Sequence, residues 1–166
     1  MTETHAPALS VAALFAGRED RRRREREAEA QLQRKSQEAL DEFQVTDERV
    51  RAVAHRIREA FDRGETELML TSFPSSFCTD DGRAVNNADV PPINRLAEPL
   101  DASLSREPEW LGTLPRGIRA VYEHWKRHLQ PGGFQFSARI INYPGGKPGD
   151  VGLFLSWPKS AVEQPT

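Results

Sequence analysis

The spacing of apolar residues changes character near residue 45. Residues 18–44 are rich in Arg, Glu, Gln and Ala, which favour helix, and they carry only a sparse apolar stripe. From residue 46 onward, the apolar positions follow the periods that the helices and strands of a packed domain require. The pattern therefore predicts a long charged helical arm followed by one compact domain.

The first helix of this domain is predicted over residues 46–63. Thr46 is placed to cap it, the first turn is acidic, and Gly64 is placed to end it. One continuous apolar face, which a core must cover, is formed by Val50, Val53, Ala54, Ile57, Ala60 and Phe61.

Three strands and a second helix are also predicted. Residues 67–73 contain apolar residues in succession, which is typical of a strand buried on both sides. A helix with Trp125 at the centre of its apolar face is predicted over residues 116–129. Alternation predicts strands over 134–143 and 151–157, which the loop 144–150 joins as a wide hairpin.

The predicted fold is α+β, in which a small three-stranded mixed sheet packs against two helices in the order α-β-α-β-β. Two strands joined through a helix normally form a right-handed parallel crossover, so strands 67–73 and 134–143 are expected to be parallel neighbours. The other face of the sheet then needs cover from the arm, a loop or a partner. That face carries Arg139, Ile141, Tyr143 and Phe154.

The expected segments are a mobile N-terminal segment 1–17, the arm 18–45, the compact domain 46–160 and a tail 161–166. Within the domain, residues 74–114 are punctuated by prolines and are expected to form a long connection with one short helix near 93–100. Connections of this length are often functional.

Composition narrows the class of protein. Cys78 is the only cysteine of the 166 residues, so no internal disulfide can form and a reducing compartment is favoured. The first residues lack the positive charge of a signal peptide, and no apolar stretch approaches the roughly 20 residues that span a bilayer. Arginine outnumbers lysine 19 to 4, which favours a GC-rich bacterial genome. We therefore expect a soluble, cytoplasmic, bacterial protein without membrane association.

The expected topology gathers polar residues at one edge of the sheet. The carboxyl ends of two parallel strands meet there, and ligands favour this edge in open α/β sheets. The alternative is that these are ordinary side chains of solvent-facing loops. The candidate ligand-binding residues are Ser75, Ser76, Cys78, Asp80, Asp81, Arg83, Thr113, Arg116, Asn142, Lys147 and Asp150.

No catalytic residue is assigned. Four residues separate Cys78 from Arg83, whereas a phosphatase-type loop has five, and Asp80 and Asp81 would raise the pKa of the thiol. Free cysteines are usually small buried apolar residues. We therefore expect no cysteine-dependent catalysis, and whether the chain is an enzyme stays open.

No metal and no cofactor is assigned either. His124 and His128 have the i, i+4 spacing of a helical metal site, but no third ligand is evident. The Gly146-Lys147 pair lacks the other residues of a phosphate-binding loop. A boundary histidine pair and a hairpin turn are the simpler interpretations.

The N-terminal part carries two candidate binding features. Val11, Leu14 and Phe15 have i, i+3, i+4 spacing after a possible Ser10 cap, which predicts a short helix that docks in a partner's groove. The alternative is that they pack on their own domain or stay disordered. A basic run next to them is weakened by interleaved acids and consists of Arg21, Arg22, Arg23, Arg24 and Arg26.

Three functions are compatible with these features. We favour macromolecular binding, as an adaptor or regulatory module, with the arm contacting another protein. The second is a small-ligand binder or enzyme that uses the sheet edge around residues 75–83 and 144–150. The third is an RNA- or ribosome-associated protein that uses the Arg21–Arg26 run, although the net charge of −2 argues against a broad nucleic-acid-binding face.

Overall fold

The structure, a computed structural model, describes residues 9–88 and 107–160. The helix expected near residues 93–100, the tail 161–166 and the first eight residues of the N-terminal segment lie outside this range. The chain divides into two compact units, Met1–Ala39 and Leu40–Thr166. Each is described by itself.

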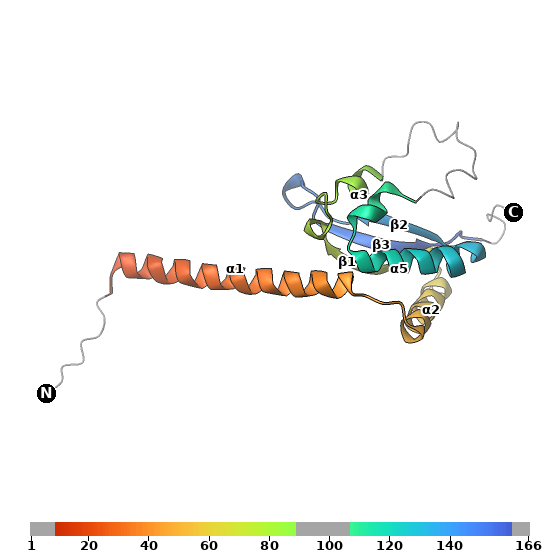
Figure 1. Cartoon of the computed structure of the whole chain (residues 1–166), viewed down its shortest axis with the longest axis horizontal. Helices are drawn as coiled ribbons and strands as arrows, with labels where there is room; N and C mark the ends of the chain where they lie inside the picture. The colour runs from red at the N-terminus through yellow and green to blue at the C-terminus, as the bar shows by residue number, and fades with distance from the viewer. Residues whose placement is uncertain (1–8, 89–106, 161–166) are drawn as a thin grey trace. The chain divides into compact units, whose positions relative to one another are not determined.

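The first unit consists of most of helix α1, which runs without interruption from Val11 to Asp41 (Figure 1). Ser10 caps its start, because the Oγ of Ser10 accepts a hydrogen bond from the amide of Ala13 at 3.1 Å. At a rise of 1.5 Å per residue, 31 residues extend over about 46 Å. The long N-terminal helix is thus confirmed, and it begins before residue 18.

The second unit is built on a three-stranded sheet in the order β1-β3-β2. The strands are β1 (Glu67–Pro74), β2 (Gln135–Ile140) and β3 (Asp150–Ser156). Strand β3 lies between the other two and is antiparallel to both. The α+β class is confirmed, but the expectation of a mixed sheet with the first two strands as parallel neighbours is wrong.

Burial explains why β3 takes the central position. All five residues from Val151 to Leu155 are buried, as a strand covered on both faces should be. Strand β1, in contrast, lies at the edge, and its register shifts between Met69 and Thr71. Within the apolar succession Leu68 to Leu70 the middle residue, Met69, is 40% exposed, so the expectation of a strand buried on both sides is wrong.

Two helices of the second unit match the expected ones. Helix α2 spans Asp47–Asp62, and the side chain of Thr46 accepts a hydrogen bond from the amide of Arg49 at 3.3 Å. Helix α5 spans Arg116–His124 and continues into a π-helical turn, Trp125–Leu129. The N-terminus of α5 is capped by a residue that is distant in the sequence, because Asp41 Oδ1 accepts a hydrogen bond from the amide of Arg116 at 2.9 Å.

The core lies between α5 and the sheet face that carries Phe136, and aromatic rings dominate it. The ring centroid of Phe136 lies 5.8 Å from that of Trp125, 5.9 Å from that of Trp110 and 6.0 Å from that of Tyr122. Such edge and offset contacts add to the hydrophobic stabilisation of the burial itself. Trp125 is therefore an inward-facing residue, as its place on the helix predicts.

The described parts of residues 74–114 are ordered into short elements instead of an open loop. They contain helix α3 (Arg83–Ala88) and 3₁₀ turns at Ser75–Phe77 and Glu109–Thr113. These short elements add buried side chains to the core, namely Phe77, Cys78, Val85, Trp110, Leu111 and Leu114.

The opposite face of the sheet is only thinly covered by the described residues. The guanidinium of Arg139 lies 3.7 Å from the ring centroid of Phe154 and also pairs with Glu67. This stacking buries Phe154 beneath a charged group that stays in contact with water. Ile141 and Tyr143 remain 39% and 50% exposed.

Candidate functional site

The start of α1 presents an exposed apolar cluster, here called the apolar tip. It consists of Val11, Leu14 and Phe15, which are 68%, 57% and 53% exposed. Residues at this spacing lie on one face of a helix, and α1 has no buried residue. The apolar tip therefore presents side chains that the described residues do not cover.

The apolar tip is followed by a basic stretch. Residues 18–26 contain six arginines and three acidic residues, so this stretch carries a net charge of +3. The Arg18 guanidinium lies 4.9 Å from the ring centroid of Phe15, and Arg23 pairs with Asp20. Arg21, Arg22, Arg24 and Arg26 lie in the same exposed helix. A partner surface that binds the apolar tip would complement this basic stretch if acidic groups lay beside its binding site.

The structure brings together the two loops that the sequence places at one edge of the sheet. β1 and β2 run in the same direction on either side of β3, so their carboxyl ends share that edge. The amide of Ser75 donates to Gly149 O at 2.8 Å, and its Oγ donates to Pro148 O at 3.0 Å. The juxtaposition is therefore observed, although the strands are not neighbours.

The polar side chains at this edge hold the loops in place. Asp80 accepts hydrogen bonds from the amides of Gly82 and Ala84, which begins helix α3. Asn142 and Asp150 are joined by two reciprocal hydrogen bonds of 2.9 Å across the hairpin. Because these acceptors and donors already have partners, a ligand would have to replace existing hydrogen bonds.

The other candidates predicted for this edge are exposed or half-buried. Asp81 occupies the left-handed region of backbone space, with φ at +57°, in the turn before α3. Thr113 is half-buried and donates to the carbonyl of Trp110 at 2.7 Å. The remaining candidates are exposed and comprise Ser76, Arg83, Arg116 and Lys147.

Cys78 lies in a setting that disfavours the thiolate. The side chain is buried, and this burial, followed by the negative charges of Asp80 and Asp81, raises the pKa of the thiol to about 11. A hydrogen bond with Thr113 opposes the shift only in part.

We expect the Cys78 thiol to react slowly with iodoacetamide in the folded protein. With a pKa of about 11, the thiolate is on the order of one molecule in a thousand at pH 8. The alkylation rate of the folded protein should therefore still be rising above pH 9. The rate for the urea-unfolded chain should level off once the pH exceeds the ordinary cysteine pKa of about 8.5. An apparent pKa below 7 in the folded protein would contradict this assignment and indicate a reactive cysteine.

The rings of His124 and His128 lie next to each other, with centroids 4.7 Å apart and planes tilted by 44°. Within residues 9–88 and 107–160, no group of three or more His, Cys, Asp or Glu side chains is placed to hold a metal ion. In the same residues, no helix has both the length and the apolar character to cross a membrane.

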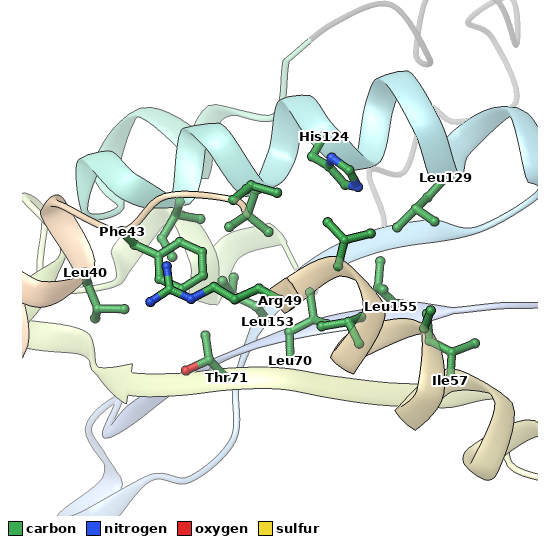
Figure 2. A pocket seen from close by; sticks show the side chains of 16 residues that line it. Leu40, Phe43, Arg49, Ile57, Leu70, Thr71, His124, Leu129, Leu153 and Leu155 are labelled. Atoms are coloured by element: carbon green, nitrogen blue, oxygen red, sulfur yellow. The ribbon is translucent and has the colours of Figure 1, made fainter. Parts of the chain in front are cut away.

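An apolar groove of about 300 Å³ separates α2 from α5 above the sheet (Figure 2). Its walls come from α2, from α5 and the turn that follows it, and from Leu40 and the residues that join α1 to α2, and its floor comes from β1 and β3. Protein interiors normally leave few voids larger than a water molecule. The apolar side chains that α2 directs into the groove include the small residues Val50, Val53 and Ala54, which leave the space between the helices unfilled.

Three lining residues of the groove are polar: Arg49, Thr71 and His124. The Arg49 guanidinium lies 4.4 Å from the ring centroid of Phe43, and its Nη1 donates to Gln44 O at 2.6 Å. Burial, then the neighbouring His128 and Arg127, lower the pKa of His124, which favours its neutral form near pH 7. Arg49 is therefore the charged group of the groove.

The groove has almost no signature in the sequence. Its apolar residues belong to faces that the sequence assigns to the core, and a gap between elements depends on how they pack. The one available signal is Arg49, which precedes Val53 by one helical turn and so interrupts the apolar face of α2.

Comparison of the chain with known protein families, curated proteins and solved structures found no match.

Proposed function

We propose that the chain is a small cytoplasmic protein-binding module that engages a partner protein through its N-terminal arm. The observation that carries this proposal is the apolar tip, three large side chains at i, i+3 and i+4 that are each more than half exposed. An amphipathic helix of this kind binds by laying its apolar residues into a groove of its partner.

The surroundings of the apolar tip support this role. The helix start is fixed by the Ser10 cap, so the tip is presented on a preformed helix and binding does not require the segment to fold first. The basic stretch behind it would favour a groove with an acidic rim and would raise the association rate at low salt. The partner is thus expected to be a protein with an apolar, acid-flanked groove.

Replacing Leu14 and Phe15 together with aspartate should abolish partner capture by the full chain. The two side chains are exposed, so the free energy of unfolding, determined from a thermal melt, should change by no more than about 0.5 kcal/mol. Capture is measured by immobilising the wild-type and variant chains and quantifying the proteins retained from a bacterial extract. The affinity for each retained protein is then determined with the purified pair.

Leu32→Asp is the matched control, since Leu32 is a leucine of the same helix that is 66% exposed and lies outside the apolar tip. It should leave capture unchanged. If Leu32→Asp and the tip variant retain the same proteins as the wild type, the tip is not the binding surface. If the retained material is nucleic acid, and is lost on replacing Arg22 and Arg24 with glutamine, the arginine run is the functional feature instead.

A further inference from the structure

The groove between α2 and α5 has the composition of a ligand site. Its volume of about 300 Å³ lies at the lower end of the range for small-molecule pockets, which are mostly apolar with a few placed polar groups. Apolar cavities of about half this size in a protein interior bind small hydrocarbons in place of water. An apolar ligand would therefore gain contacts that neither water nor the neighbouring side chains supply.

The polarity of the groove is concentrated at one end. In Figure 2, the Arg49 guanidinium lies beside Phe43, whereas Ile57, Leu129 and Leu155 gather at the opposite end. Ile57 also lines a second hollow of about 440 Å³, which is bordered by Phe61 and by the charged residues Arg58, Asp62 and Lys159. The groove itself thus combines a cationic end with an apolar end.

Arg49 has donors to spare. A guanidinium carries five N–H donors in a planar fork, and among the described residues Gln44 O is the acceptor for one of them, on Nη1. Across residues 9–88 and 107–160, no acidic side chain forms an ion pair with Arg49. Its stacking on Phe43 holds the group in place, and a planar fork of this kind matches a carboxylate in a bidentate manner.

The lining of the groove favours an aliphatic ligand. Thirteen of the sixteen residues that line it are apolar. An extended aliphatic chain needs only a narrow channel of apolar side chains with one polar group at its end.

We propose that this groove binds a single-chain aliphatic carboxylate, a fatty acid, with the carboxylate on Arg49 and the chain directed toward Ile57, Leu129 and Leu155. This site is separate from the apolar tip, so it does not depend on the proposed arm binding. Binding involves no covalent step.

The proposal is tested by calorimetric titration of the full chain with dodecanoate below its micelle-forming concentration. Dodecanol and dodecyltrimethylammonium serve as probes with the same chain and a neutral or cationic head. Dodecanoate should bind at least tenfold more tightly than either, because charge-assisted hydrogen bonds to a guanidinium contribute a free energy equal to about one order of magnitude in affinity or more. Equal affinity for the three probes, or no binding of dodecanoate, would overturn the proposal.

Two variants locate the site. Arg49→Gln should reduce dodecanoate affinity at least tenfold and leave that of dodecanol unchanged, whereas Arg51→Gln, an exposed arginine of the same helix, should change neither. Ala54→Leu should weaken both probes by filling the groove, and a thermal melt verifies that it folds. Should Ala54→Leu destabilise the chain, Val121→Leu fills the same space from α5.

Three results would assign the ligand to another place. Retention of binding in a folded Ala54→Leu or Val121→Leu variant would exclude the groove. Loss of binding in Leu14→Asp would place the ligand on the apolar tip. Displacement of dodecanoate by a peptide of residues 9–20 at similar concentration would show that the groove accepts a helix, so that a fatty acid is not its specific occupant. Each of these outcomes contradicts a site dedicated to a fatty acid.

Discussion

Replacing Trp125 with alanine should lower the free energy of unfolding by about 3–5 kcal/mol, which is the usual cost of truncating a buried large aromatic side chain. Trp125 is 9% exposed and contacts the rings of Tyr122 and Phe136, with centroid separations of 5.4 and 5.8 Å. Its Nε1 also donates to Phe134 O at 2.9 Å. The substitution therefore removes ring contacts, a hydrogen bond and a large volume at once.

Urea unfolding of the full chain, followed by circular dichroism, measures this loss. Trp157→Ala is the matched control, because Trp157 is only half-buried and its ring contacts Phe134 at the end of the sheet. The free energy of unfolding should fall clearly less in Trp157→Ala than in Trp125→Ala. A loss below about 1 kcal/mol for Trp125→Ala would mean that the face of α5 assigned to the core is wrong.

The parts of the fold that could be predicted from the sequence are those with a long, regular pattern. Helix α2 has an apolar period that recurs over about three turns and a threonine cap, and Trp125, where α5 continues into the π-helical turn, is central to the apolar face of residues 116–129. Strand β3 has apolar residues at every second position, Val151, Leu153 and Leu155, although the residues between them are buried as well. In each case a local rule and the tertiary packing agree, so the pattern alone locates the element.

The strand order could not be predicted because the decisive signals are short. A succession of apolar residues in β1 resembles a strand with neighbours on both sides, yet Met69 is 40% exposed and the register shifts beside it. The hairpin of β2 and β3 therefore pairs with β1 through its second strand. The prediction that residues 75–83 and 144–150 converge survived this error, because β1 and β2 still run in the same direction.

The segment after β1 contains core residues that also could not be predicted from the sequence. Phe77, Val85 and Trp110 are core residues, but each belongs to an element of three to six residues. Elements this short have no measurable periodicity, and the prolines around them favour the interpretation as a loop. Their burial is decided by the distant partners they meet, such as Phe136 for Trp110.

Replacing Gly117 with alanine should destabilise the second unit by about 3 kcal/mol, toward the upper end of the cost of overpacking. In an exposed helix interior the same change would stabilise by about 1 kcal/mol. Here a Cβ would lie 1.9 Å from Leu40 O and 2.8 Å from Phe43 Cβ. A backbone oxygen cannot move away by changing rotamer, so the steric cost exceeds the helix propensity.

The matched control is Gly112→Ala, because a Cβ at Gly112 would meet nothing within 4 Å. Its unfolding free energy should stay within about 0.5 kcal/mol of the wild type. Gly117→Ala should also weaken dodecanoate binding, since relief of the clash must displace Leu40 and Phe43, which line the groove beside Arg49. A stabilising Gly117→Ala would show that residues 40–43 do not pack on α5. In that event Asp41 could not cap the helix either, and Leu40 and Phe43 would not form the wall of the groove at the Arg49 end.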